Sequence, residues 1–222
     1  MLIAFEGTDG TGKTTQAKLL AESLNTKGIK CTYTSEPTSG IHGSAIRRVL
    51  QGDRKASPTE LLEMFMNDRY EHVENVIKPK LEAGEIVIAD RYVLSTMVYQ
   101  SLSGFSATHL WNRQKMYPFP QLTFIFYGET DRLMQRIRMR EGAEERYENR
   151  GTLDKVNQLY MSYADVPSFL LLKADSYTIE ALQGTVEEFV QPALDCEHLY
   201  GITWDARAQF EQHINQINGE QQ

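Results

Sequence analysis

A glycine-rich loop near the N-terminus constrains the fold more than any other feature of this sequence. Residues 7–14 read Gly-Thr-Asp-Gly-Thr-Gly-Lys-Thr and match the phosphate-binding pattern G-x-x-x-x-G-K-[ST] at every required position. An apolar run over residues 2–5 precedes the loop, and apolar residues at helical spacing follow it over residues 13–27. A strand, a glycine-rich loop and a helix in this order predict a P-loop α/β fold that binds a nucleoside triphosphate.

The residue types of this loop suit the chemistry of a phosphate site. Glycines allow a backbone path that turns N–H groups toward phosphate oxygens. The Lys13 ammonium can meet the β- and γ-phosphates, and the Thr14 hydroxyl can bind Mg²⁺. The predicted ATP-binding residues are the loop and its next neighbour: Gly7, Thr8, Asp9, Gly10, Thr11, Gly12, Lys13, Thr14 and Thr15.

The rest of the chain alternates predicted strands with predicted helices. Further strands are expected over residues 29–34, 86–89, 122–127 and 169–174. Helices are expected over residues 44–50, 58–81, 94–102, 107–115 and 130–140, over a stretch that ends near 164, and over 179–190. Because the strands are almost wholly apolar, we expect a parallel sheet with helices on both faces.

The expected architecture is a three-layer αβα P-loop domain with a five-stranded parallel sheet over residues 1–192. A charged, arginine-containing stretch near residues 138–150 is predicted to form a lid. Residues 193–222 are predicted to be a C-terminal extension with one short amphipathic helix around 206–217.

Composition narrows the possible partners and location. The 222 residues carry a net charge of −7, which argues against a broad basic face for duplex nucleic acid. No apolar run approaches the length of a membrane span, and we find no signal-peptide pattern. Cys31 and Cys196 match neither a metal site nor a disulfide framework. We therefore expect a cytoplasmic protein without a nucleic-acid or membrane partner.

Other P-loop classes fit poorly. A GTPase needs an Asn-Lys-x-Asp base reader and an Asp-x-x-Gly switch, and neither pattern occurs outside the loop itself. Motor and transporter ATPases need a longer chain. A kinase that acts on a small molecule is the class that remains.

Several clusters resemble the thymidylate kinase family. Residues 5–16 are similar to its phosphate loop, including the acidic Asp9. The run Asp-Arg-Tyr at residues 90–92, followed by Ser95 and by Tyr-Gln at 99–100, is similar to its most specific signature. Phe65 and Arg69 match its base-binding pair, and Glu-Arg-Tyr-Glu at residues 145–148 resembles its lid. The resemblance covers about residues 2–192.

This resemblance implies an Mg²⁺-dependent transfer of phosphate from ATP to dTMP by a homodimer. The implied catalytic residues are Lys13, Asp90, Arg91, Arg140 and Arg146, and the implied metal-binding residues are Thr14 and Asp90. The implied substrate-binding residues are Asp9, Glu36, Arg47, Phe65, Arg69, Arg91, Ser95, Thr96, Tyr99 and Gln100.

The residues themselves are consistent with these roles. Asp90 and Arg91 fall at the carboxyl end of a strand, where a carboxylate can hold Mg²⁺ through water and an arginine can bridge two phosphates. Phe65 and Arg69 are four positions apart, so that both project from one side of a helix. Arg47 is preferred over its neighbour Arg48 as a clamp for the acceptor phosphate.

Some positions depart from the family pattern. Ser35 stands where the family usually has an arginine, and Thr-Ser at residues 38–39 replaces the usual glycine pair. Gly10 takes the place that holds a catalytic arginine in one branch of the family. The resemblance then implies that lid-side arginines supply this charge, with Arg136, Arg140 and Arg146 as candidates.

Two alternatives stay open at this point. A deoxynucleoside kinase would place a carboxylate near the 5′-hydroxyl of its substrate, and Glu36 stands at the expected position after the second strand. A nucleotide-binding module without catalytic activity is the other alternative, although Lys13, Thr14, Asp90 and Arg91 argue against it.

Overall fold

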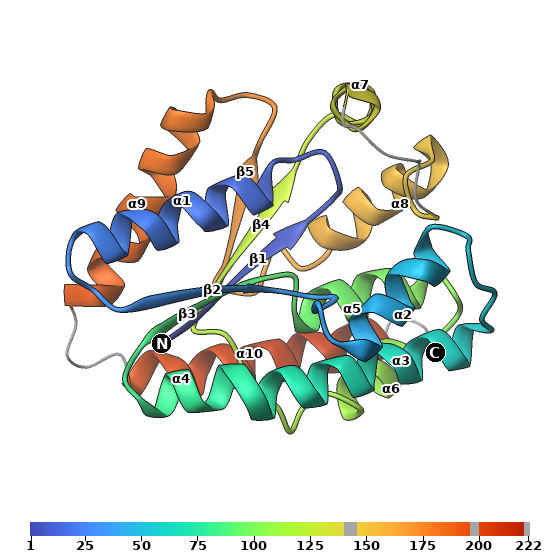
Figure 1. Ribbon diagram of the computed structural model, residues 1–222, viewed down its shortest axis with the longest axis horizontal. Coiled ribbons are helices and arrows are strands. Elements are labelled where there is room, and N and C mark those ends of the chain that lie inside the picture. Colours follow the sequence, from blue (N-terminus) through green and yellow to red (C-terminus); the bar gives the residue numbers. More distant parts are fainter. Residues whose placement is uncertain (140–145, 196–199, 220–222) are drawn as a thin grey trace.

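Parallel strands form the centre of the molecule. The computed structural model describes residues 1–139, 146–195 and 200–219. Within these ranges one sheet contains β1 (Leu2–Gly7), β2 (Cys31–Ser35), β3 (Ile86–Asp90), β4 (Leu122–Tyr127) and β5 (Phe169–Lys173), in the order β2-β3-β1-β4-β5 (Figure 1). Every ladder is parallel. The predicted five-stranded parallel sheet is therefore confirmed.

Helices cover both faces of this sheet (Figure 1). They are α1 (Lys13–Thr26), α2 (Ile41–Leu50), α3 (Pro58–His72), the π-helical turn η1 (Val73–Ile77), α4 (Lys78–Glu82), α5 (Val93–Ser101), α6 (Ala107–Asn112), α7 (Thr130–Met139), α8 (Arg150–Met161), α9 (Ile179–Asp195) and α10 (Tyr200–Gly219). The three-layer αβα architecture is thus the one that the sequence predicts.

Alternate residues of the strands face two hydrophobic cores. Leu2 and Ala4 of β1 pack toward α3, α5 and α10, whereas Ile3 and Phe5 pack toward α1 and α9. This division follows from the two-residue repeat of a strand, which sends successive side chains to opposite faces. Since both faces of the sheet are buried, polar side chains gather where the strands end.

The helix expected over residues 58–81 has a defined start and an irregular middle. The Ser57 hydroxyl accepts the backbone N–H of Glu60, and the Glu60 carboxylate accepts the backbone N–H of Ser57, with Pro58 in the first turn. The π-helical turn η1 then separates α3 from α4. Pro79, which has no N–H to donate, lies just after this turn.

The last helix is longer than the one that the sequence predicts around residues 206–217. Position 192, where we expected the main domain to end, lies inside α9. The last helix, α10, has 20 residues, and its Phe210 is fully buried among the rings of Trp111, Tyr163 and Phe169. No helix in the described part of the chain is long and apolar enough to span a membrane.

Candidate active site

The end of β1 positions the phosphate loop. Gly7 has a φ of 134°, and a Cβ there would lie 2.0 Å from the carbonyl oxygen of Phe126, so the chain requires glycine. Gly10 has a φ of 82°, and a Cβ there would lie 2.7 Å from the carbonyl oxygen of Leu133 in α7. The loop therefore packs against α7 before α1 begins at Lys13.

A pocket opens over the phosphate loop. The Lys13 Nζ lies there, 3.3 Å from Oδ1 of Asp9 and 3.4 Å from the carbonyl oxygen of Thr8. Arg136 of α7 reaches the same pocket, and the half-exposed Tyr177 and Ile179 form an apolar wall. The full lining is Asp9, Gly10, Thr11, Gly12, Lys13, Thr14, Thr15, Gln16, Arg136, Ile137, Ala174, Tyr177, Thr178, Ile179 and Leu182.

Asp90, at the end of β3, lies beside this pocket. Its Oδ2 accepts hydrogen bonds from the Thr14 hydroxyl at 2.5 Å and from the Tyr33 hydroxyl at 3.3 Å. Its Oδ1 is buried and has no hydrogen-bond partner among the described residues. No group of three or more His, Cys, Asp or Glu side chains with metal-binding geometry occurs in the described ranges.

Arg91 follows in a strained backbone conformation. Its φ of 68° lies in the left-handed region, which non-glycine residues rarely occupy. The buried Glu6 carboxylate holds the next turn in place by accepting the backbone N–H groups of Tyr92 at 2.9 Å and Ser95 at 3.1 Å. The strain thus aims the Arg91 guanidinium across the ends of the strands, where it donates to Oδ1 of Asp9 at 2.5 Å.

The buried charges shift one another's pKa values. Burial alone would raise the pKa of Asp9, but the cations of Arg91 and Lys13 hold it well below its ordinary value. Burial and the nearby Arg91 lower the pKa of Lys13. For Glu6, burial dominates and raises the pKa. Asp9 is therefore a fixed anion between two cations.

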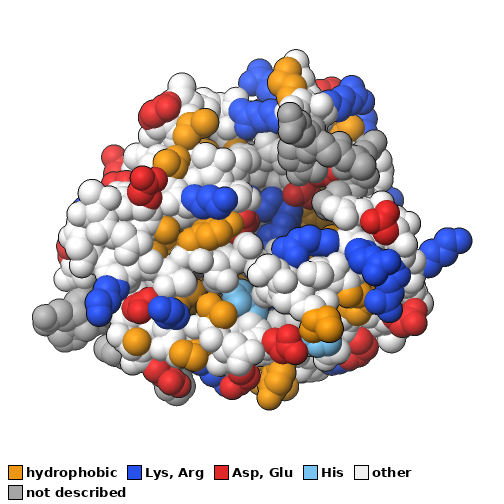
Figure 2. Space-filling view, viewed as in Figure 1, with side chains coloured by type: hydrophobic (Ala, Val, Ile, Leu, Met, Phe, Trp, Pro, Cys, Tyr) orange, Lys and Arg blue, Asp and Glu red, His pale blue; other side chains and the backbone are white. Residues whose placement is uncertain are grey.

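A second pocket adjoins the first at Asp9, which lines both. Figure 2 shows basic side chains in and around a hollow on this face of the molecule. The residues that line the second pocket are Asp9, Glu36, Pro37, Leu50, Phe65, Arg69, Arg91, Ser95, Thr96, Tyr99, Gln100, Tyr147 and Glu148. The set contains every predicted substrate-binding residue except Arg47.

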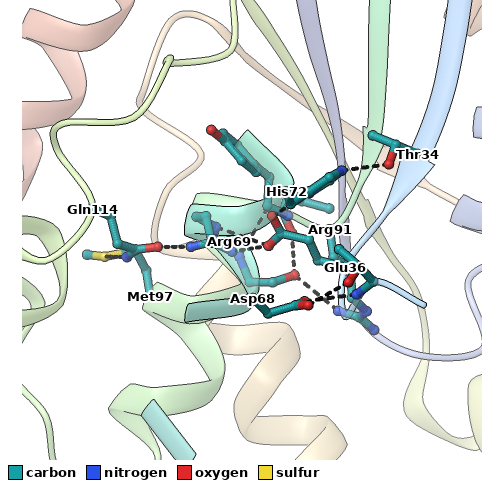
Figure 3. Close-up of polar contacts among 12 residues, drawn as sticks. Thr34, Glu36, Asp68, Arg69, His72, Arg91, Met97 and Gln114 are labelled. Carbon is teal, nitrogen blue, oxygen red and sulfur yellow. Dashed lines mark hydrogen bonds and ion pairs between the residues drawn. The ribbon is translucent and has the colours of Figure 1, made fainter. Parts of the chain in front are cut away.

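Arg69 is held in a buried polar network on one wall of the second pocket (Figure 3). Its Nε donates to Oε2 of Glu36 at 3.0 Å, and its NH1 donates to the side-chain oxygen of Gln114. Nδ1 of His72 lies 2.9 Å from the other Glu36 oxygen, and Nε2 lies 2.6 Å from the Thr34 hydroxyl. Burial alone would raise the pKa of Glu36, but the Arg69 guanidinium keeps that pKa below its ordinary value.

Unlike Arg69, the Gln100 side chain has no hydrogen-bond partner among the described residues. Its side chain is buried, and neither its Nε2 nor its Oε1 makes a hydrogen bond to a described residue. A buried amide without partners costs free energy, unless a ligand supplies a matching donor and acceptor. The second pocket therefore contains one amide that is prepared for a polar ligand.

Arg47 lies outside this pocket lining and shapes the loop that borders it. Its NH1 donates to the carbonyl oxygen of Thr38 at 2.5 Å, and its NH2 donates to the carbonyl oxygen of Pro37. Asp68 holds the same loop by accepting the backbone N–H of Thr38 at 2.8 Å. The structure thus places the Arg47 guanidinium against the backbone of residues 37–38, and its role as a clamp on the phosphate stays a prediction.

Two of the three predicted lid arginines, Arg136 and Arg146, belong to the described residues, and they lie in different places. Arg140 lies outside the described residues. The guanidinium of Arg146 lies over the ring of Tyr147, and its backbone N–H donates to the carbonyl oxygen of Leu50 at 2.8 Å. Of the three candidates, the described structure brings Arg136 to the phosphate pocket. Tyr147 enters the second pocket, where its ring centre lies 5.1 Å from that of Tyr99.

Sequence reasoning missed several of these side chains. Glu6 directly precedes the phosphate loop, and this adjacency was a usable signal. His72 is three positions after Arg69 and shares its side of α3. Gln114 is 45 positions from Arg69, and nothing local in the sequence links the two.

The chain is similar to thymidylate kinases. A family model described as thymidylate kinase matches residues 5–186. A thymidylate kinase from Desulfotalea psychrophila is 40% identical over 72% of this chain and 80% of its own length. A probable thymidylate kinase from Methanococcus aeolicus is 35% identical over 87% of this chain and 95% of its own. The solved thymidylate kinase of Candida albicans has a similar fold, with a TM-score of 0.71 and 23% identity over 86% of this chain and 91% of that one.

Proposed function

The chain belongs to the thymidylate kinase family, and from this premise we propose that it transfers the γ-phosphoryl group of ATP to dTMP, giving dTDP and ADP. One observation carries the proposal: the phosphate-loop pocket and the second pocket meet at Asp9, which is held by Lys13 on one side and by Arg91 on the other. Two nucleotides bound in adjoining pockets can bring their phosphates together.

ATP occupies the first pocket in this proposal. The N–H groups at the start of α1 and the Lys13 ammonium meet the β- and γ-phosphates. Tyr177 and Ile179 offer apolar surface on which a purine ring can pack. Arg136 supplies a further cation at the rim.

The residues at the end of β3 fit a Mg²⁺ ion. A hard cation prefers oxygen ligands, and this place holds the Thr14 hydroxyl and the Asp90 carboxylate, one oxygen of which is buried without a partner in the described structure. When bound, Mg²⁺ neutralises charge on the β- and γ-phosphates. The assignment of Thr14 and Asp90 as its binding residues is part of the proposal.

The thymine of dTMP occupies the second pocket. The Phe65 ring lies in the wall and offers a face for stacking. Gln100 offers one acceptor and an NH₂ donor, which complement the N3–H and a carbonyl of thymine. Arg69 has five N–H donors, of which Glu36 and Gln114 use only part, so the guanidinium retains a donor for the other carbonyl. Tyr99 lies toward Asp9, on the sugar side.

Phosphoryl transfer then depends on position and charge. The dTMP phosphate brings its own negatively charged oxygen as nucleophile, so no protein group has to remove a proton. Arg91 and Lys13 lie where charge develops on the transferred group, and both are largely shielded from water and held by Asp9. Asp9 orients both cations, and its low pKa keeps it from acting as a base.

The same geometry disfavours a deoxynucleoside kinase. That reaction needs a free carboxylate near the 5′-hydroxyl, and Glu36 was the candidate. Both Glu36 oxygens are engaged, by Arg69 and by His72, and its pKa is lowered. No observation favours a module without catalytic activity, because Lys13, Asp90 and Arg91 converge on one place.

A coupled assay of ADP release tests the proposal. The purified chain is incubated with ATP and Mg²⁺ and with dTMP, dUMP, dCMP or thymidine in turn. We expect turnover with dTMP that exceeds turnover with thymidine by at least 100-fold. A preference for thymidine, or ATP consumption that does not depend on any acceptor, would contradict it.

Three further assignments remain proposals. A homodimer is supported by apolar surface on α2 and α3, where Ile41 is 78% and Tyr70 is 56% exposed, and light scattering after gel filtration measures the assembly directly. A cytoplasmic location and the absence of a nucleic-acid partner are supported only by the composition and the net charge of −7.

A further inference from the structure

We propose that Asn157 is a positioning residue, which sets the conformation of the phosphate loop from the helix that follows the lid. Asn157 belongs to α8 and reaches the loop through the hydroxyl of Thr8. The inference rests on the proposed function, since it assigns the loop a part in ATP turnover. It goes beyond that function in identifying what holds the loop in place.

The hydrogen bonds of Asn157 fix the orientation of its amide. One atom of the amide lies 2.8 Å from the carbonyl oxygen of Gly128, which can only accept, so that atom is the nitrogen Nδ2. The oxygen Oδ1 therefore faces Thr8, whose hydroxyl donates to it at 2.6 Å. Thr8 is fully buried and Asn157 is half-buried, so this bond is largely shielded from water.

Thr8 supplies one of the two loop oxygens that accept the Lys13 ammonium, and Asp9 supplies the other. Its backbone N–H donates to the carbonyl oxygen of Phe126 at 3.2 Å. Its own carbonyl oxygen accepts the Thr11 hydroxyl at 2.7 Å and the Lys13 ammonium at 3.4 Å. A rotation of this peptide would move an acceptor of Lys13, and the bond to Asn157 resists that rotation.

The bond between Asn157 and Thr8 is one of three side-chain contacts that α8 makes with neighbouring elements. Asp154 accepts the hydroxyl of Thr130, at the start of α7. Three residues later comes Asn157, and three residues after that comes Tyr160, whose hydroxyl lies 3.0 Å from that of Ser95. This i, i+3, i+6 row joins α8 to α7, to the phosphate loop and to the segment that follows Arg91.

Two variants of Thr8 test the link. Thr8→Val keeps the shape and removes the hydroxyl, whereas Thr8→Ser keeps the hydroxyl. For Thr8→Val we expect KM for ATP to rise 5- to 20-fold and kcat to fall, with KM for dTMP within twofold of the wild type. Thr8→Ser should rescue the defect, with KM for ATP and kcat closer to the wild-type values than to those of Thr8→Val. Thr8→Val kinetics equal to the wild type, or an equal rise of both KM values, would overturn the inference.

A double-variant comparison separates positioning from a general loss of structure. Asn157→Ala should reproduce the kinetic pattern of Thr8→Val, and the double variant should be no worse than the poorer single one. Gln158→Ala, on the exposed side of the same helix, is the matched control and should behave as the wild type. Losses that multiply in the double variant would contradict a shared role.

Calorimetric titration with ADP keeps this test independent of the proposed reaction. We expect Thr8→Val and Asn157→Ala to weaken ADP binding by a similar factor of 5 to 20, with melting temperatures that confirm folding. Unchanged ADP affinity in both variants would overturn the inference. A wild-type chain that binds ADP but does not phosphorylate dTMP would instead contradict the proposed function.

Discussion

At the scale of single residues, the site is built from groups whose charges are already paired before any nucleotide binds. Asp9 lies between Lys13 and Arg91, and Glu36 lies between Arg69 and His72. Such pairing costs desolvation, which is repaid only by good geometry. The benefit is preorganisation, because the cations need not reorient when phosphates arrive.

Gln100→Leu should separate stability from function. The free protein loses a buried amide without partners in the described structure, so its free energy of unfolding should rise by about 1–2 kcal/mol. The complex loses the proposed contacts with thymine, so affinity for dTMP should fall roughly 10- to 100-fold while ATP affinity stays the same. Thermal unfolding and titration calorimetry measure the two effects. A destabilised variant with normal dTMP binding would contradict this account.

The Glu36–Arg69 pair predicts a dependence of stability on pH. The folded-state pKa of Glu36 lies below its ordinary value of 4.5, so the ionised carboxylate stabilises the fold above about pH 4.5, and the contribution disappears as the pH falls through the folded-state pKa. At pH 7, Glu36→Gln should cost about 3–5 kcal/mol, because the buried Arg69 loses its counter-ion.

Urea unfolding of the wild type and of Glu36→Gln between pH 7 and pH 3 measures this contribution. The difference in unfolding free energy should be largest at pH 7 and should shrink as the pH falls below about 4.5, where the Glu36 carboxylate takes up a proton more readily in the unfolded chain than in the folded one. Exposed pairs such as Lys78–Glu74 provide the control, since Glu74→Gln should have little effect at any pH. A difference that stays constant over this range would refute the assignment.

At the scale of elements, the strands and the phosphate loop could be predicted, because their signals are local. Apolar runs define the strands, and the loop pattern is continuous in sequence. Most residues that line the second pocket could also be predicted, because their pattern resembles that of the thymidylate kinase family. The network around Arg69 could not be predicted, since Gln114 comes from a distant segment. Which arginine faces the phosphates depends on how α7 packs on the loop at Gly10, and spacing alone does not specify that packing.

Helix α7 carries a prediction about the arginine that meets the γ-phosphate. Arg136 reaches the phosphate pocket, whereas Arg138 of the same helix borders a different surface hollow with Asp131 and Arg150. Arg136→Ala should therefore lower kcat by about 10²- to 10³-fold with a small change in KM, as for a contact made mainly in the transition state. Arg138→Ala should keep at least a third of the wild-type kcat. If steady-state kinetics showed the same loss of kcat in both variants, α7 would act only through its overall charge.

At the scale of the whole molecule, the last helix completes the core. Phe210 of α10 contacts the rings of Trp111 in α6, Tyr163 just after α8 and Phe169 in β5. Ile214 of α10 is buried in the same core. The segment that the sequence marked as an extension therefore closes the face of the sheet that carries α3 and α5. These two helices present Phe65, Arg69 and Gln100 to the second pocket, so core packing and the proposed dTMP site share one layer.

Phe210→Ala should destabilise the whole domain. Removal of a fully buried ring from this cluster is expected to lower the free energy of unfolding by about 3–5 kcal/mol. At a temperature where the variant is still folded, KM for ATP should be unchanged, because α1, which begins in the phosphate loop, packs in the other hydrophobic core. Chemical unfolding and initial rates give both values. A cost below about 1 kcal/mol would show that α10 is dispensable for the fold.

The central claim is that two nucleotides bind together in pockets that meet at Asp9 and exchange a phosphoryl group directly. Initial rates of dTDP formation, measured against dTMP at several fixed ATP concentrations, test it most directly. We predict double-reciprocal lines that converge, with one ADP formed for each dTDP, because transfer requires both substrates at once. Parallel lines would indicate a phosphorylated enzyme intermediate, and ADP formation without dTDP would indicate hydrolysis. Either result would contradict the account.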